Sequence, residues 1–167
     1  MPATDPLYSV CDGHLCFDGL DLVKTADAHE TPFFVFSERR LRDNVAAVLT
    51  SFRRTHAATE VFYASRACSN RWFLGVVRDA GAGVEVNSGG ELDKALEAGF
   101  EPGQIVFNGV AKTRDEIRRA LAAGIRALIV DSLYDLDRIG AVARARDAVA
   151  PLAPPIDIPL PPPAPPG

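Results

Sequence analysis

The sequence has few cysteines and histidines, the residues on which small secreted and metal-binding proteins depend. Its three cysteines are odd in number and form no C-x-x-C pair, so neither a disulfide framework nor a structural zinc site is predicted. Its three histidines are scattered without the spacing of metal ligands, and no G-x-S-x-G element marks a serine hydrolase. A reducing compartment suits this composition, and we expect the protein to be cytoplasmic.

Long apolar runs and an excess of positive charge are also missing. No stretch approaches the roughly 20 apolar residues of a membrane span, and the N-terminus lacks a basic segment followed by an apolar run. The net charge of −4 gives no basic footprint for nucleic acid or for an anionic membrane. We therefore expect no nucleic-acid partner and no membrane partner.

The 167 residues do contain a regular alternation of short apolar runs and amphipathic segments. The apolar runs begin at Val61, Val84, Gln104 and Ala127, at nearly equal spacing. This alternation predicts strand–helix units that build a parallel α/β sheet. A doubly wound sheet and a (β/α)8 barrel satisfy the spacing equally, because periodicity alone cannot count missing strands.

Capping residues and amphipathic stripes place helices between these strands. Glu38 to Phe52 has apolar residues at steps of three and four, which predicts a helix that starts after the N-cap Ser37. Ser88 and Thr113 are expected to cap two further helices, with Glu116 at the capping-box position of Thr113.

The two ends of the chain depart from this pattern. Residues 1–30 are predicted to form a strand–turn lead-in around Asp12-Gly13, and the run FFVF that follows Thr31-Pro32 is expected to be a buried strand. The strand–helix region is expected to occupy residues 31–149. Residues 150–167 are rich in proline and predict an extended, polyproline-like tail, which could be a linker or could dock an SH3-type groove.

Polar residues gather where the predicted strands end. Arg66 directly follows the run VFYA, and Glu85 and Ser88 lie at or just after the next strand. Because the carboxyl ends of parallel strands meet at one edge, these three residues can converge on one ligand. Four more polar residues fall on the same rim: Asn108, Lys112, Asp131 and Ser132. The alternative is that these residues cap helices and form local salt bridges.

Four segments of the sequence resemble one protein family. VFYASRACSN resembles the F-Y-A-x-K-A-x-x-N segment of pyridoxal-phosphate-dependent decarboxylases with the alanine-racemase-like fold, the diaminopimelate and ornithine decarboxylases. TPFFVFSERRLRDN, GAGVEVNSGGELDKALEAGF and IVFNGVAKTRDEIRRALAAGI are similar to further motifs of that family. Among its members, the S-G-G-E-L run is closer to the diaminopimelate decarboxylases.

The resemblance implies an incomplete fold of the parallel (β/α) barrel type. On this alignment the chain supplies four strands, about half of a (β/α)8 barrel, followed by the proline-rich C-terminal tail. The resemblance also implies a glycine-rich phosphate loop, a stacking histidine, an acid that pairs with the pyridine nitrogen and a C-terminal β domain. None of these is found in the sequence, so we expect a truncated or degenerate relative.

The resemblance further implies roles for five residues. Arg66 stands where the family has the lysine that forms a Schiff base with pyridoxal phosphate, and Glu85 matches an acidic residue near the cofactor. Ala64 falls where a small residue lies behind the cofactor ring, and Ser88 and Glu91 match other cofactor-binding positions. A guanidinium stays protonated and is a poor nucleophile. We therefore expect no covalent attachment of pyridoxal phosphate and no decarboxylase activity.

Two other hypotheses remain open at this point. The chain could be a non-catalytic module, because a half barrel with open sheet edges could pair with a second copy as a homodimer or with a full-length relative. Such a module could also hold a small amino-acid or anion ligand at Arg66, whose planar fork suits phosphate and carboxylate. The last hypothesis is a barrel or flavodoxin-like domain of unrelated function.

Overall fold

The computed structural model describes residues 7–153, which divide into two compact units. The first unit extends to Asn44 and the second begins at Val45, inside helix α2 (Glu38–Arg53). Asp18 accepts hydrogen bonds from Ser37 and Arg39, which hold the start of α2 to the rest of the first unit.

A three-stranded antiparallel sheet and a short helix make up the first unit. Its elements are β1 (Tyr8–Cys11), β2 (His14–Phe17), β3 (Leu20–Asp21) and α1 (Leu22–Ala28). The sheet order is β1-β2-β3, and Asp12 and Gly13 both have positive φ between β1 and β2. This is the backbone that a two-residue hairpin turn requires, and the strands predicted on either side of it are confirmed.

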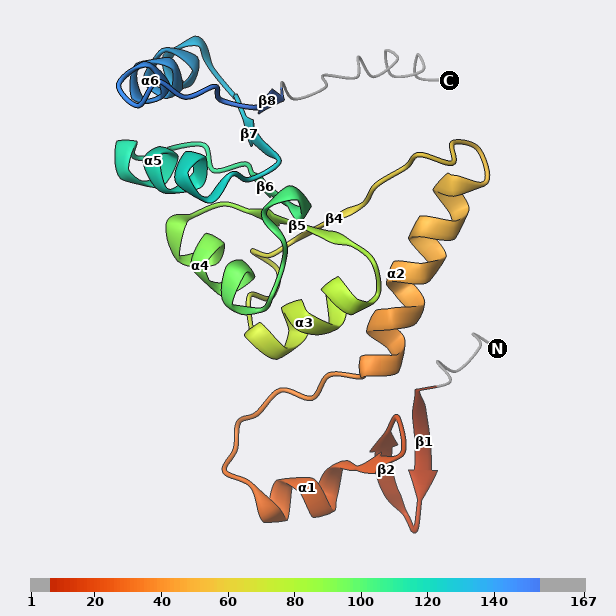
Figure 1. Cartoon of the computed structure of the whole chain (residues 1–167). Coiled ribbons are helices and arrows are strands. Elements are labelled where there is room, and N and C mark those ends of the chain that lie inside the picture. The colour runs from red at the N-terminus through yellow and green to blue at the C-terminus, as the bar shows by residue number, and fades with distance from the viewer. Residues whose placement is uncertain (1–6, 154–167) are drawn as a thin grey trace, which may run out of the picture. The chain divides into compact units, whose positions relative to one another are not determined.

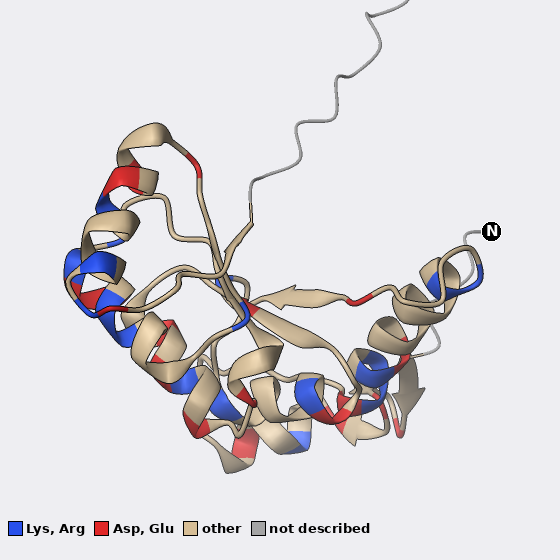
Figure 2. Ribbon diagram, turned by 45° about the horizontal axis from the view of Figure 1, so that its top comes forward, with Lys and Arg blue, Asp and Glu red and all other residues tan. Residues whose placement is uncertain are grey.

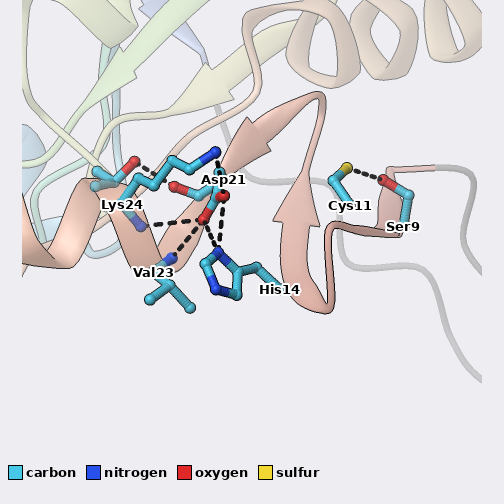
Figure 3. A network of polar contacts seen from close by, with 7 residues as sticks. Ser9, Cys11, His14, Asp21, Val23 and Lys24 are labelled. Atoms are coloured by element: carbon cyan, nitrogen blue, oxygen red, sulfur yellow. Dashed lines mark hydrogen bonds and ion pairs between the residues drawn. The ribbon is translucent and has the colours of Figure 1, made fainter.

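Asp21 joins this sheet to α1. Its carboxylate caps the helix by accepting hydrogen bonds from the backbone N–H groups of Val23 and Lys24, and it lies 2.9 Å from Nδ1 of His14 (Figure 3). The Lys24 backbone N–H is the largest cause that lowers the pKa of Asp21 to about 2. The cap is therefore charged at any physiological pH.

Residues 33–36, the FFVF run, do not form a strand. Phe34 is 91% exposed and Phe36 is half exposed, so the prediction of a buried strand is wrong. An apolar run becomes a strand only where a neighbouring strand supplies hydrogen-bond partners. Within residues 7–153, no strand of either sheet pairs with this run.

The second unit alternates strands with helices. After α2 its elements are β4 (Phe62–Ala64), α3 (Arg71–Asp79), β5 (Gly83–Val86), α4 (Gly89–Glu97), the 3-10 turn η1 (Pro102–Gln104), β6 (Ile105–Phe107), α5 (Arg114–Ala123), β7 (Ala127–Ile129), α6 (Leu133–Arg144) and β8 (Leu152–Ala153). The sheet order is β4-β5-β6-β7-β8 and every neighbouring pair is parallel. The predicted parallel α/β fold of the barrel type is confirmed.

The core of the second unit lies between this sheet and helices α3 to α6, which follow one another along one face of it (Figure 1). The strands contribute fully buried Val84, Val86, Ile105, Phe107 and Leu128, and the helices contribute Leu74, Val77, Leu92, Ala95, Ile117, Ala120 and Ile139. Burial of each large aliphatic side chain contributes about 1.5–3 kcal/mol. Charged residues lie mainly on the helices (Figure 2). None of the helices described between residues 7 and 153 is long and apolar enough to cross a membrane.

The last strand, β8, corrects the expectation that regular structure stops at Val149. Val130 N–H donates to the carbonyl of Ala153 at 3.0 Å, and β8 pairs with β7 in parallel. The sheet therefore has five strands among the described residues, where four were predicted. A two-residue strand beside prolines has no periodicity to detect, and the edge of β7 supplies its hydrogen-bond partners. Residues 154–167, and with them the hypothesis of SH3-type docking, lie outside the described residues.

Glu116 joins the first turns of two helices. Its Oε2 accepts a hydrogen bond from Thr113 N–H at 2.8 Å in the predicted capping box, and its Oε1 accepts one from Gly89 N–H at 2.7 Å at the start of α4. Burial raises the pKa of Glu116, but the hydrogen bonds from Thr113 and Gly89 outweigh burial, and the net pKa is lowered. The predicted cap thus also links α5 to α4.

Glu116→Ala is expected to lower the free energy of unfolding by about 1–2 kcal/mol, the usual loss for a helix cap. Asp115→Ala is the matched control, since exposed Asp115 pairs with Arg118 at the surface, and its effect should stay within about 0.5 kcal/mol. Because the folded-state pKa of Glu116 is lowered, its contribution is complete above the unfolded-state pKa. It is lost as pH falls through the folded-state pKa.

Urea unfolding at neutral and acidic pH measures both effects. The difference between wild type and Glu116→Ala should shrink in acid, and a difference that stays constant with pH would show that the charged cap is not its source.

Candidate functional site

Arg66 and Glu85 meet at the carboxyl ends of β4 and β5. Arg66 lies in the turn that follows β4, and the register of the two strands sets Ala64 beside Glu85. Arg66 Nη1 donates to Glu85 Oε2 at 2.7 Å and lies 3.1 Å from Oε1. The structure therefore brings together the two residues to which the sequence assigns the central chemistry, and it joins them as an ion pair.

Glu85 is the fixed member of this ion pair. Its side chain is 11% exposed, whereas that of Arg66 is 62% exposed. Its Oε1 also accepts hydrogen bonds from the side-chain amides of Asn87 at 3.1 Å and Asn108 at 2.9 Å. Asn108 was expected on this rim, but Asn87 was missed. The two-residue alternation of strands could have found Asn87, since it follows Glu85 by two positions.

Gly109 brings the loop after β6 close to this cluster. A Cβ atom added at Gly109 would lie 2.4 Å from the carbonyl oxygen of Asn87. Because no larger residue fits against that backbone, Gly109 allows the neighbouring Asn108 to reach Glu85.

Glu91 contacts the turn that carries Arg66. It accepts hydrogen bonds from Ser65 Oγ at 2.5 Å and from the backbone N–H of Asn87 at 2.9 Å. Ser65 is completely buried and was not predicted from the sequence. Glu91 thus ties the turn after β4 to the first turn of α4.

Two of the predicted rim residues act as helix caps. Ser88 Oγ accepts a hydrogen bond from Glu91 N–H at 3.3 Å at the start of α4, and Ser132 Oγ accepts one from Asp135 N–H at 3.1 Å at the start of α6. Asp131 is exposed beside Ser132, within reach of its hydroxyl. The alternative reading of the rim, that its residues cap helices, is correct for Ser88 and Ser132.

Lys112 is completely buried beneath the rim. Its Nζ donates to the carbonyl oxygens of Gly109 at 2.6 Å and Ile129 at 2.8 Å. It also lies 2.7 Å from Asp135 Oδ2, in an ion-pair contact without hydrogen-bond alignment. Lys112 therefore links the loop after β6, the end of β7 and the start of α6.

The cluster at the rim combines one guanidinium, two carboxylates and two amides. Glu85 neutralises Arg66, and Glu91 adds a second negative charge nearby, so the cluster is not an electropositive anion site. Among residues 7–153, no group of histidine, cysteine and acidic residues could hold a metal ion. The arrangement can orient a ligand by hydrogen bonds, but it contains no amine nucleophile.

Replacing either partner of the ion pair should have unequal effects on stability. Glu85→Ala leaves the half-buried amides of Asn87 and Asn108 without their acceptor, which should cost about 1–3 kcal/mol of unfolding free energy. Arg66→Met removes an exposed partner and should cost less than about 1 kcal/mol. Urea unfolding followed by the fluorescence of Trp72, the single tryptophan, measures both. Equal losses for the two variants would contradict this asymmetry.

The fold and the cluster together define a (β/α)-barrel-type domain that carries its polar site at the carboxyl ends of the strands. Residues 42–156 match the family described as pyridoxal-dependent decarboxylase, pyridoxal binding domain. The match covers more than half of the chain, and the chain belongs to this family. The cofactor of this family is pyridoxal phosphate, and the resemblance drawn from the sequence motifs is confirmed.

Relatives of known identity agree with this assignment. Diaminopimelate decarboxylase of Methanothermobacter thermautotrophicus is 36% identical over 131 residues, which are 78% of this chain and 30% of that protein. The enzyme of Pseudomonas aeruginosa is 35% identical over 148 residues, 87% of this chain and 35% of that protein.

A solved structure agrees as well. Diaminopimelate decarboxylase from M. jannaschii in co-complex with L-lysine superposes with a TM-score of 0.82 at 32% identity, covering 89% of this chain and 35% of that one. The chain thus spans about a third of the length of the relatives it matches.

Proposed function

We propose that this chain is the pyridoxal-phosphate-binding barrel portion of a diaminopimelate-decarboxylase-like protein, and that Arg66 in place of the cofactor's lysine leaves it without decarboxylase activity. The observation that carries the proposal is the Arg66–Glu85 ion pair. The L-lysine in the M. jannaschii structure supports a small amino acid as the class of ligand. The proposal places the chain in the cytoplasm, because the sequence has no disulfide framework of the kind that secreted proteins use.

The side chains at the rim do not fit covalent attachment of pyridoxal phosphate. Attachment requires an amine lone pair that attacks the aldehyde, whereas a guanidinium stays protonated and has no such lone pair. Its contact with Glu85 also holds Arg66 in place. The other positions matched to the cofactor site, Ala64, Ser88 and Glu91, carry no amine.

None of the three lysines of the sequence replaces the missing amine. Lys112 is buried and held by two carbonyl oxygens and Asp135. Lys94 lies on α4 and donates to Ser69 Oγ at 3.0 Å. Lys24 belongs to the first unit, where it pairs with Asp21. The proposed loss of activity therefore rests on position 66.

Restoring an amine at position 66 tests the proposal. Wild type, Arg66→Lys and Arg71→Lys are incubated with pyridoxal phosphate, reduced with borohydride and mapped by peptide mass. Arg71 is the matched control, since it is an exposed arginine that pairs with Glu97 at 2.8 Å. Arg66→Lys should give a reducible adduct at position 66, at least about tenfold above that of Arg71→Lys at position 71, because a preorganised site raises the local reactivity.

Two outcomes would count against this proposal. Wild-type protein that forms a covalent adduct and releases CO2 from an amino acid would show that the activity survives without the lysine. Equal labelling of Arg66→Lys and Arg71→Lys would show that position 66 is not a prepared cofactor site.

A second candidate function is association through the sheet. Within the described residues, β4 and β8 each pair on one side only, so both edges expose backbone groups that another chain could satisfy. A second copy or a full-length relative would supply such strands. The small-anion version of this hypothesis is weaker, because Glu85 already neutralises Arg66.

Sedimentation of the 167-residue chain over a wide concentration range tests association. A mass that rises with concentration is expected, since pairing of the edges would be an intermolecular equilibrium. A constant monomer mass, alone and with a full-length diaminopimelate decarboxylase, would contradict association.

A further inference from the structure

Two of the three cysteines, Cys11 and Cys16, lie on one face of the first unit's hairpin. The register of β1 and β2 pairs Ser9 with Cys16 and Cys11 with His14, so these four side chains lie on the same face. Cys11 and Cys16 are therefore diagonal neighbours on this face. The Cys11 Sγ also lies 3.6 Å from Ser9 Oγ (Figure 3).

We propose that Cys11 and Cys16 are a redox pair that closes to an intramolecular disulfide by exchange with a small disulfide such as oxidised glutathione. This modification site is independent of the proposed function, because it lies in the first unit and uses no residue of the rim. In the reduced protein both cysteines are free thiols.

The geometry of the hairpin favours this closure. Diagonal neighbours on antiparallel strands have Cα atoms about 7–8 Å apart, and a disulfide accepts up to about 6.8 Å, so closure needs an approach of only about 1 Å. Cys11 is the last residue of β1, next to the turn at Asp12 and Gly13. In the described part of the chain β1 pairs only with β2, so its outer side does not oppose this movement.

The two thiols differ in access, which assigns them different roles. Cys11 is partly exposed, whereas Cys16 is 1% exposed. The neighbouring Cys11 thiol, together with burial, raises the pKa of the Cys16 thiol to about 11. Cys11 is therefore the thiol that meets the oxidant, and Cys16 is the resolving thiol.

The reaction proceeds by two exchanges. The Cys11 thiolate attacks one sulfur of oxidised glutathione, which forms a mixed disulfide and releases one glutathione thiolate. Cys16 then gives up its proton and its sulfur attacks the Cys11 sulfur, which forms the intramolecular bond and releases the second glutathione. Two protein thiols are oxidised and one glutathione disulfide is reduced to two glutathione molecules, which carry away the two protons.

Thiol exchange suits this face better than metal binding. His14 is held by the carboxylate of Asp21 at 2.9 Å, and no cluster of metal-binding side chains exists in the part of the chain that the structure describes. The thiols are therefore left with each other and with Ser9 as partners.

Intact-mass measurement of the reduced full chain after incubation with oxidised glutathione tests the proposal. Wild type and Cys68→Ser should both lose two hydrogens, and peptide mapping should locate the bond between Cys11 and Cys16. Cys68 is the control because it lies in the second unit, beyond the hairpin. Cys16→Ser should stop at a mixed disulfide on Cys11, with the mass of one added glutathione, and Cys11→Ser should form no intramolecular disulfide.

The rate of disulfide closure is also measured in urea, where the chain is unfolded. This comparison separates the effect of the folded hairpin from the effect of the short distance between Cys11 and Cys16 in the sequence. Closure should be at least about tenfold faster in the folded protein, because the hairpin holds the thiols together. Cys16→Ala serves in place of Cys16→Ser if circular dichroism shows that a buried hydroxyl unfolds the hairpin. Closure no faster than in urea, a bond that includes Cys68, or glutathione adducts without loss of two hydrogens would overturn the proposal.

Discussion

The parallel hydrogen-bond ladder between β4 and β5 is the constraint on which the candidate site depends. It sets Ala64 beside Glu85 and so brings the turn that carries Arg66 to the Glu85 carboxylate. The ladder between β5 and β6 adds Asn108 to the same carboxylate. A slip of β5 by one residue would turn Glu85 toward the helices, where a carboxylate without partners is strongly destabilising.

Helix caps connect this ladder to the layer of helices. Ser88, Thr113 and Ser132 cap α4, α5 and α6 at the same end of the sheet, so the first turns of three helices surround the ends of the strands. Two side chains then join neighbouring strand–helix repeats of the second unit. Glu116 links the starts of α4 and α5, and Lys112 links the loop after β6 to the end of β7. The rim is consequently held by short polar contacts, and Arg66 and Asp131 are its exposed charges.

Most of the fold could be predicted because its signals are local. The spacing of the apolar runs and the residues at helix starts predicted β4 to β7 and the caps at Ser88 and Thr113. The FFVF run and the strand Leu152–Ala153 could not be predicted, since each outcome depends on whether another strand offers hydrogen-bond partners. The pairing of Arg66 with Glu85 could have been predicted from the alignment of adjacent parallel strands. The burial of Lys112 against Asp135 could not have been predicted in this way.

The sequence by itself determined the family, the order of strands and helices, and the arginine at the position of the family's Schiff-base lysine. These features could be recognised because motifs and periodicity depend on residues that are close together in the sequence. Only the tertiary structure decided that Glu85 neutralises this arginine, that Lys112 is unavailable, and that Cys11 and Cys16 share one face of the hairpin. Each of these depends on which side chains from different strands and loops share one face. That is a property of register and packing, and the spacing of residues along the chain does not contain it.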